Sequence, residues 1–557
     1  MQNACFALRA KLTIEDAICS RRTDFFHSSF AQHRNVKTSY IRSVVICFTK
    51  HSIMNSTTAS TGHPKGLWVL FGTEMWERFN YYGMRAVLVL FMTKALLFDK
   101  VFASNLYGSY TSLVYLTPLI GGYVADRFWG NQRSIIAGGI VMALGEFLLF
   151  FCGSTYATAP ELSSVLFFSG LGLMIAGNGF FKPNISSLVG QLYPKGDRRI
   201  DSAYTIFYMG INVGGAMGPF ICGLLGDTGN PADFKWAFLA AGIGMLISVV
   251  VQMLFHKKYV VGPDNQELGA PPANAPAMWH NPIFIVGGLA LLSAVAIGLL
   301  YIDAKVVSYL TYLLIAATLL IAFIIFSDKS LNGIEKQRIG VIFIVAFFVI
   351  FFWSAFEQAG ASLTFFAEEQ TQRDIGFFVV PASLFQSLNS IFVIVFAPVF
   401  AWLWLKLGKY EPSSPTKMAI GLLLLSIGYL WIATGVKDAG AGIKVSMIWL
   451  VGMYALHTWG ELSLSPIGLS LVNKLAPFKF ASLLMAVWFL ANAAANKLAG
   501  VLSALYPEAG KTTQFLGYRM ENLYDFFMLF VGMSGVAALI LFLLTKKLQQ
   551  MMHEQHA

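Results

Sequence analysis

Charged side chains are scarce in this chain, which has 557 residues of which 12% are Asp, Glu, Lys or Arg. A soluble globular domain carries about 25%, so too few charges are present to cover a water-soluble surface. Hydrophobic residues make up 56% of the chain and gather in runs of about 20 residues, the length that crosses the hydrocarbon core of a bilayer. The composition excludes a soluble enzyme, a nucleic-acid-binding protein and a secreted disulfide-rich protein. It predicts an all-α polytopic membrane protein, in which the net charge of +10 belongs to basic loops.

Cysteine is too rare to build a framework of disulfides. The five cysteines are Cys5, Cys19, Cys47, Cys152 and Cys222. They form no CxxC pair and no His/Cys spacing that would bind zinc. The apolar runs also contain no pair of aspartates, no HExxH and no GxSxG, which are motifs of hydrolases. We therefore expect no metal, no cofactor and no enzymatic activity.

The first 53 residues differ from the rest of the chain. They contain three of the cysteines and no long apolar run, because the patch at residues 43–48 is far too short to cross a bilayer. Met54 then opens a short polar segment directly before the first strong hydrophobic run. We expect Met54 to be the native start and residues 1–53 to be dispensable for expression and membrane insertion. The alternative is a disordered basic tail.

From Leu67 onward the sequence contains fourteen apolar runs, each expected to span the membrane as a helix. They lie near residues 67–93, 104–126, 133–152, 163–189, 202–225, 235–255, 283–302, 306–326, 339–366, 378–405, 416–435, 445–471, 480–505 and 523–545. Without the seventh and eighth runs, six runs precede and six follow. Paired halves of this kind build the central site of many secondary transporters.

The predicted organisation is therefore two six-helix bundles joined by a linker that holds two additional transmembrane helices. The expected divisions are an N-terminal extension and leader at 1–66, the first bundle at 67–255, the linker at 256–338, the second bundle at 339–545 and a cytoplasmic tail at 546–557. The second run ends in GGYVADRFWGNQR, and the tenth ends in a comparable basic turn. The first turn resembles the signature loop of the major facilitator superfamily, with Asp126 and Arg127 at the matching positions. The alternative is a generic basic turn.

Loop charges predict the orientation in the membrane. Loops after even-numbered runs, together with the C-terminal tail, carry seventeen basic residues: Arg127, Arg133, Lys195, Arg198, Arg199, Lys257, Lys258, Lys329, Lys336, Arg338, Lys406, Lys409, Lys417, Lys474, Lys479, Lys546 and Lys547. Loops after odd-numbered runs carry nine: Lys94, Lys100, Lys235, Lys305, Arg373, Lys437, Lys444, Lys511 and Arg519. Because basic loops stay in the cytoplasm, both termini are expected there.

Eight ionisable side chains stand out inside the apolar runs, where each costs about 2.5–3.5 kcal/mol at the bilayer centre. They are Glu74, Glu77, Arg78, Arg85, Glu146, Lys182, Glu357 and Glu461. Such costs are acceptable where the charges pair across a polar cavity, so these residues are candidates for a functional site. The alternative is a buried ion-pair network that ties helices together. Glu146 has no functional interpretation beyond a helix–helix hydrogen bond.

The first run concentrates these groups on one side of a helix. At 100° per residue its charged residues share a sector of about 140° with Tyr81 and Tyr82. In the fourth run, the sequence GNGFFKPN places Asn178 and Lys182 one turn apart on one face. Pro183 follows and favours a bend, because it removes a backbone hydrogen bond. A buried lysine needs a partner, and Glu77 or Glu461 is the expected one.

Six motifs in order resemble the proton-dependent oligopeptide transporter family of the major facilitator superfamily, in its bacterial form with two extra helices between the halves. EMWERFNYYG at residues 74–83 fits the family signature ExxERFxYYG, and FYMGINVGG at residues 207–215 fits FYxxINxG. WSAFEQAGASL, FQSLN, GELSLSPIGLSLV and MAVWFLANA resemble further segments of the family. The resemblance covers residues 62–545.

The resemblance implies the import of di- and tripeptides driven by inward proton flow, across the bacterial inner (plasma) membrane and by a protein that works as a monomer. The implied substrate-binding residues are Tyr81, Tyr82, Arg85, Tyr115, Lys182, Asn212, Trp353, Asn389, Glu461, Ser465 and Trp488. A peptide zwitterion needs a cationic and an anionic pole. Arg85 and Lys182 are expected to bind the peptide carboxylate, and Glu461 its ammonium.

Proton coupling and gating involve an overlapping set of residues. The residues expected to couple protons are Glu74, Glu77, Arg78, Lys182 and Glu357. Glu77 is the central one, because it neighbours Arg78 and lies within reach of Lys182. Salt bridges between Arg85 and Glu357, and between Lys182 and Glu461, are expected to close the outer and the inner side respectively.

Two other functions fit the same architecture. A relative that carries nitrate or a drug is expected to lack the complete first-helix signature and to use a histidine in the second half, where the apolar runs contain only His457. A nutrient receptor would bind peptide without transporting it. The complete signature favours peptide transport.

Overall fold

The computed structural model describes residues 62–194, 196–272, 276, 282–305, 309–437, 443–508 and 511–553. The chain divides into two units, residues 1–63 and residues 64–557, and every described helix and strand lies in the second unit. The expected start at Met54 and the segment 1–53 lie outside the described residues.

Fourteen of the described helices have at least 17 residues, one for each predicted apolar run. They are α3 (Lys65–Lys94), α4 (Lys100–Leu116), α6 (Asn131–Thr155), α7 (Pro160–Gln191), α8 (Ile200–Gly226), α9 (Phe234–Tyr259), α10 (Pro282–Lys305), α11 (Tyr309–Phe326), α12 (Gly333–Phe356), α14 (Ser387–Leu407), α15 (Ser414–Val436), α16 (Met447–Leu475), α17 (Ala481–Ser503) and α18 (Leu523–Met552). The prediction of an all-α protein with fourteen long helices is confirmed.

The remaining elements are short and connect or extend the long helices. They are α5 (Pro118–Val124), η1 (Ala125–Trp129), η2 (Pro231–Asp233), η4 (Glu357–Gly360), α13 (Ser362–Gln370), η5 (Ala382–Gln386), η6 (Gly408–Tyr410) and η7 (Phe478–Phe480). Strand β1 (Thr371–Gln372) pairs in parallel with β2 (Val445–Ser446), and β3 (Thr513–Phe515) pairs antiparallel with β4 (Tyr518–Met520). The basic turn predicted at Asp126 and Arg127 is η1, where both side chains are exposed.

Side-chain caps mark several helix starts. Asp99 accepts a hydrogen bond from the backbone N–H of Phe102 at the start of α4. Asn332 and Glu335 form a reciprocal capping box at the start of α12. These caps satisfy N–H groups that have no partner inside the helix. Pro183 lies inside α7, which continues through it.

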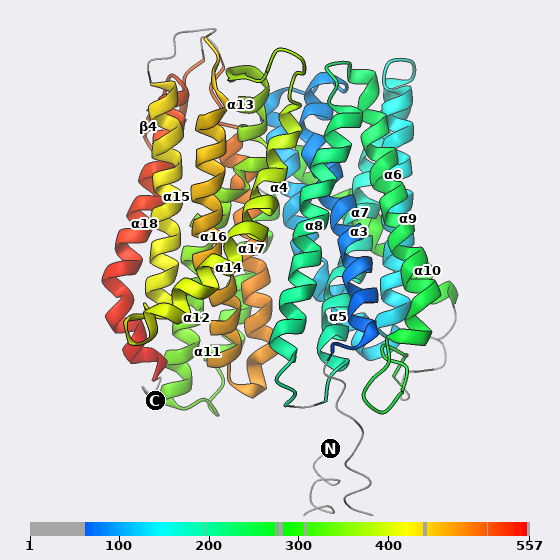
Figure 1. Ribbon diagram of the computed structural model, residues 1–557, viewed down its shortest axis with the longest axis vertical. Helices are drawn as coiled ribbons and strands as arrows, with labels where there is room; N and C mark the ends of the chain where they lie inside the picture. Colours follow the sequence, from blue (N-terminus) through cyan, green and yellow to red (C-terminus); the bar gives the residue numbers. More distant parts are fainter. Residues whose placement is uncertain are drawn as a thin grey trace, which may run out of the picture. The chain divides into compact units, whose positions relative to one another are not determined.

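The long helices pack in two groups. In the first helix group (α3–α9), α3 packs against α8 and α9, and α6 packs against α7 and α9. In the second helix group (α12–α18), α15 packs against α16 and α18, and α12 packs against α17. Figure 1 shows these helices running side by side, with α13 and β4 at one end and α5 at the other. We call these ends the Lys94 end and the Lys65 end, after the two ends of α3.

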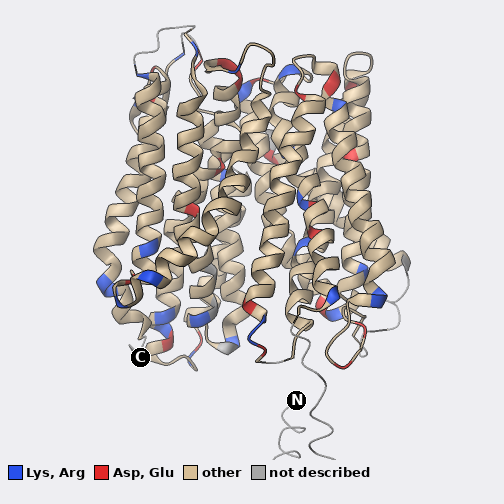
Figure 2. Cartoon of the chain, viewed as in Figure 1, with Lys and Arg blue, Asp and Glu red and all other residues tan. Residues whose placement is uncertain are grey.

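Burial is inverted relative to a soluble protein. Within the described ranges, eleven helical segments are long and apolar enough to cross a membrane. The segment Ala382–Tyr410 around α14 is only 11% buried within its most apolar part. The four charged residues in the interior of α3, Glu74, Glu77, Arg78 and Arg85, are buried instead. Figure 2 shows charges inside the helix bundle as well as at its two ends. Because hydrocarbon replaces water around such surfaces, the chain is a multi-pass membrane protein.

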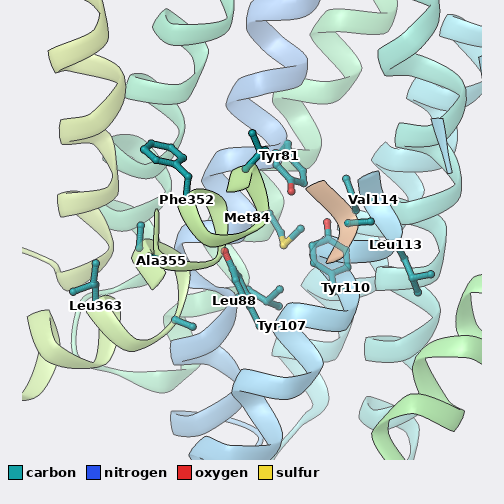
Figure 3. Close-up of a cluster of buried hydrophobic side chains, with 14 of the residues drawn as sticks. Tyr81, Met84, Leu88, Tyr107, Tyr110, Leu113, Val114, Phe352, Ala355 and Leu363 are labelled. Carbon is teal, nitrogen blue, oxygen red and sulfur yellow. The ribbon is translucent and has the colours of Figure 1, made fainter. Parts of the chain in front are cut away.

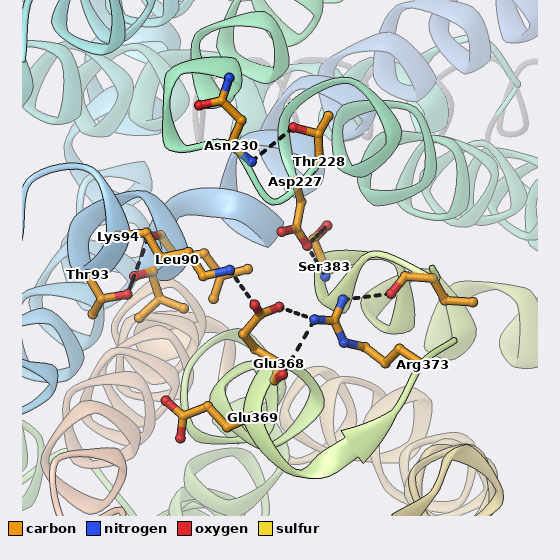
Figure 4. A network of polar contacts seen from close by, with 12 residues as sticks. Leu90, Thr93, Lys94, Asp227, Thr228, Asn230, Glu368, Glu369, Arg373 and Ser383 are labelled. Atoms are coloured by element: carbon orange, nitrogen blue, oxygen red, sulfur yellow. Dashed lines mark hydrogen bonds and ion pairs between the residues drawn. The ribbon is translucent and has the colours of Figure 1, made fainter. Parts of the chain in front are cut away.

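The two helix groups contact each other between their middle and the Lys94 end. Gly108 of α4 and Gly500 of α17 lie so close that a Cβ on either would be within 2.7 Å of the other's backbone. Lys100 forms an ion pair of 2.6 Å with Glu369, and Lys94 forms one with Glu368, as Figure 4 shows for the second pair. Among the described residues, no hydrogen bond or ion pair joins the two groups nearer to the Lys65 end. The bundle is therefore closed at the Lys94 end.

Candidate functional site

The centre of the candidate site is a cluster of three charged side chains on α3. Arg78 Nε lies 2.8 Å from Glu74 Oε1 and 2.7 Å from Glu77 Oε2. All three residues are buried, with at most 2% of their surface exposed. Two carboxylates share one guanidinium group, so the ionised cluster carries one net negative charge.

The neighbouring helix α7 supplies polar contacts to this cluster. Asn178 Nδ2 donates a hydrogen bond of 3.0 Å to Glu77 Oε1. One turn further, Lys182 is half-buried, and its Nζ lies 4.4 Å from the centre of the Tyr115 ring. A cation over an aromatic face is attracted by the ring quadrupole, so Tyr115 holds the ammonium group without neutralising it.

The expected ion pairs of Lys182 are not present in this conformation. No ion pair within the described part of the chain joins Lys182 to Glu77 or to Glu461. The expectation assumed that burial forces a lysine into a pair. Arg78 instead holds the Glu77 carboxylate, and half-exposure leaves Lys182 partly solvated.

The expected ion pair between Arg85 and Glu357 is present. Arg85 Nη1 lies 2.9 Å from Glu357 Oε2 and joins α3 of the first helix group to η4 of the second. The Arg85 guanidinium also lies 5.1 Å from the centre of the Tyr82 ring. The pair lies in the half of α3 nearer to the Lys94 end, where the two groups are closed against each other.

The second helix group contributes a carboxylate, Glu461, that accepts a hydrogen bond from a neighbouring amide. Asn389 Nδ2 donates to Glu461 Oε2 at 2.8 Å and lies 3.1 Å from Thr458 Oγ1. Glu461 is 9% exposed. No ion pair to Glu461 is found among the described residues. The predicted residues Asn389 and Glu461 therefore lie together, and the amide orients the carboxylate.

The other predicted residues occupy varied environments. Asn212 donates to the carbonyl of Tyr208 on its own helix at 2.9 Å. Tyr81 is 2% exposed and belongs to a cluster with Met84, Tyr107 and Phe352, which Figure 3 shows. The remaining three, Trp353, Ser465 and Trp488, are half-buried or buried. No described contact assigns any of these residues to a substrate.

Glu146 forms the helix–helix hydrogen bond expected for it. Asn80 Nδ2 donates to Glu146 Oε1 at 3.0 Å, and the same nitrogen lies 3.0 Å from the carbonyl oxygen of Ala241. The bond joins α3 to α6, and Asn80 adds a link to α9. Asn80 and Glu146 together therefore connect three helices of the first group.

Two polar links were not found from the sequence. Lys497 of α17 pairs with Asp303 of α10, and both residues contact Ser109 of α4. Asp227, directly after α8, accepts bonds of 3.0 Å from both Ser383 N and Ser383 Oγ. Lys497 lies inside an apolar run and Asp303 at the edge of one. A search for ionisable residues in apolar runs, which identified Lys182, would therefore also have identified Lys497 and Asp303.

The sequence matches one family of transporters over most of the chain. Residues 132–518 match the sequence profile of the POT family. The chain belongs to the POT family. A peptide transporter of Yersinia enterocolitica is 37% identical over 79% of this chain and 88% of its own. A di-/tripeptide transporter of Lactococcus lactis is 33% identical over 87% of this chain and 96% of its own.

Solved structures of POT proteins have the same fold. The crystal structure of a mutant peptide transporter in complex with sulfate matches with a TM-score of 0.73 and 33% identity, over 88% of this chain and 96% of that chain. A POT family transporter in complex with 5-aminolevulinic acid matches with a TM-score of 0.73 and 30% identity, over 88% and 98% of the two chains. The predicted family and major facilitator fold are confirmed.

Proposed function

We propose that this POT family protein imports di- and tripeptides into the cell together with protons, by alternating access of one central site. It acts in the bacterial inner membrane as a monomer, with both termini in the cytoplasm, without a cofactor and without enzymatic activity. Relatives named as di- and tripeptide transporters, at 30–33% identity over most of the chain, support this proposal.

One observation carries the choice of a peptide as substrate. Lys182 of the first helix group and Glu461 of the second each lack an ion-pair partner among the described residues. A peptide zwitterion carries the complementary carboxylate and ammonium groups. Because a charge without an ion pair near the bilayer centre is costly, a ligand that pairs with both residues gains binding energy and draws the two groups together.

The charge balance of the α3 cluster supports proton coupling. Glu74, Glu77 and Arg78 carry one net negative charge when ionised, and Lys182 is near enough to interact electrostatically with both carboxylates. When a peptide carboxylate neutralises Lys182, the negative charge of the cluster loses its compensation. A proton on Glu77 restores neutrality. Peptide and proton binding therefore favour each other.

The orientation follows from the loop charges. Arg127, Arg198, Lys257 and Lys336 belong to segments at the Lys65 end, and Figure 2 shows Lys and Arg gathered there. Basic loops favour the cytoplasm, so the Lys65 end faces inward and the closed Lys94 end faces outward. We assign this conformation as closed to the outside, with Arg85 and Glu357 as part of the outer closure.

The decisive experiment is uptake of labelled dialanine into proteoliposomes of the purified protein. We expect accumulation above equilibrium only with an inwardly directed proton gradient, and none with Glu461→Gln. A protein that binds dialanine without accumulating it would be a receptor. Accumulation that is unchanged when the proton gradient is abolished by an ionophore would exclude proton coupling.

A further inference from the structure

The outer closure contains a carboxylate that the proposed function does not use. Asp227 follows α8 directly and lies outside the membrane-spanning segment Ile200–Gly226. Its Oδ2 accepts two hydrogen bonds of 3.0 Å from Ser383, one from the backbone N–H and one from the hydroxyl. Ser383 lies in η5, which leads into α14. One carboxylate oxygen therefore joins the first helix group to the second.

Asp227 lies beside a cavity that opens at the Lys94 end. The cavity has a volume of about 330 Å³ and is lined by Asp227, Thr228, Glu368 and Arg373, among others. Thr228 is exposed, whereas Asp227 is only 6% exposed. Water and protons from the outer solution thus have access to a carboxylate that the closure has almost removed from water.

Neighbouring charges do not neutralise Asp227. Figure 4 shows that Lys94 and Arg373 both bind Glu368, and that Asp227 turns to Ser383 instead. The connection between α8 and α9 contains a second acid, Asp233, which accepts a hydrogen bond from Thr228. Among the described residues Asp227 has no ion pair of its own. Closing the outer side therefore buries a carboxylate that has two hydrogen bonds but no ion pair among the described residues.

We infer that Asp227 is a proton-binding site of the outer side, and that the protein closes to the outside more readily when Asp227 carries a proton. This inference rests on the proposed orientation and on alternating access. Because the site stays on the outer side of the closure, its proton returns to the outer solution when the closure opens. It is therefore not the proton that is transported with the peptide.

The sign of the effect follows from burial. Burial raises the pKa of the Asp227 carboxyl above its ordinary value; the bonds from Ser383 and the charge of Lys94 offset this only in part, and Glu368 adds to it. When the outer side is open, Asp227 is solvated and its pKa is near the ordinary value of about 4. The closed state thus binds the proton more tightly, so closure is favoured as the pH falls toward that value and is less favoured at high pH.

A distance measurement in the complete protein tests this inference without any substrate. Spin labels at Ala157→Cys and Gln514→Cys, on a background without other cysteines, report the separation of the two helix groups at the Lys94 end. Both positions are exposed. In the parent protein in liposomes we expect the population with the short distance to increase as the pH is lowered from about 8 to about 5.

Variants separate Asp227 from other acids. Asp227→Asn keeps an oxygen for Ser383 and carries no charge. In this variant the population with the short distance should already be high at pH 8. Its increase between pH 8 and pH 5 should be at most half of that in the parent. Asp227→Glu still titrates and should keep the change, as should Asp233→Asn. An Asp227→Asn protein with the full pH response of the parent, or a parent without any response, would overturn the inference.

Transport measurements distinguish this inference from the proposed function. The ratio of protons to dialanine taken up should be the same in Asp227→Asn and in the parent, because the site does not carry the transported proton. A lower ratio in Asp227→Asn would overturn the assignment to the outer side. If the parent takes up no dialanine at all, the proposed function fails, and the distance measurement still decides whether Asp227 controls closure.

Discussion

Asn178 donates a hydrogen bond to Glu77, so the buried charge cluster of α3 is bound to the helix that carries Lys182. Asn178 and Lys182 are one turn apart on α7, and a movement of α7 therefore affects both residues. A peptide carboxylate that draws Lys182 toward itself changes the surroundings of Glu77 through the same helix. This connection gives the proposed proton coupling a direct structural path.

Replacing Glu77 by Gln tests that path. Glu77→Gln keeps an oxygen for Asn178 but removes the proton-binding group and the net negative charge of the cluster. We expect proton-driven accumulation of dialanine to be abolished, while exchange of external for internal peptide is partly kept. Both are measured in proteoliposomes, with and without a proton gradient. Gradient-driven uptake at the parent rate would exclude Glu77 from proton coupling.

The sequence was sufficient for the fold and for the charged centre of the site, for a physical reason. Each buried charge of α3 interrupts a run of apolar residues, and the cost of that interruption makes Glu74, Glu77, Arg78 and Arg85 visible without a structure. Helical periodicity then places them on one side. Their partners from neighbouring helices are harder to predict, because the distances depend on the packing of the whole bundle.

Lys182 shows the limit of this reasoning. The sequence requires some compensation for a lysine in α7, but it does not show that the Tyr115 ring supplies part of it. In the same way, the bonds between Asp227 and Ser383 join residues 156 positions apart. Neither Asp nor Ser is unusual beside a loop, so their sequence context gives no signal.

The buried ion pair between Asp303 and Lys497 should matter for stability. Their side chains are 3% and 2% exposed, and removing one partner of such a pair leaves a buried charge, at a cost of about 3–5 kcal/mol. We expect Lys497→Met and Asp303→Leu each to lower the midpoint of thermal unfolding in detergent clearly.

The double variant is the matched control for this pair. Replacing both partners by apolar residues of similar size is often neutral or stabilising, so Asp303→Leu with Lys497→Met should recover most of the loss. Additive losses in the double variant would show that the two residues contribute independently, for example through Ser109.

The contact between Asn80 and Glu146 predicts that stability depends on the acceptor oxygen of residue 146 and not on its charge. Glu146→Gln keeps the acceptor oxygen for Asn80, so stability should hardly change. Glu146→Leu removes that acceptor, and a buried donor that loses its partner costs about 1–3 kcal/mol. The comparison is made by thermal unfolding of the two variants under identical conditions. Equal stability of Glu146→Leu and the parent would show that Ala241 alone satisfies Asn80.

The two poles of the site give the most specific prediction. If Glu461 binds the peptide ammonium, Glu461→Gln should weaken binding of free dialanine far more than binding of N-acetylated dialanine, which lacks that charge. Removing one partner of a buried charged pair costs about 3–5 kcal/mol, so the difference should reach about 100-fold or more.

The opposite pole provides the control. Lys182→Ala and Arg85→Ala should penalise a free C-terminus more than an amidated one, and should not discriminate between free and acetylated N-termini. Equilibrium binding is the correct measurement, because Lys182 also takes part in the proposed proton coupling and affects transport rates through it. If Glu461→Gln weakens free and acetylated peptides equally, the peptide is not oriented as we propose. Glu461 would then act on the closure of the inner side, where its contact with Asn389 positions it for a partner other than the substrate.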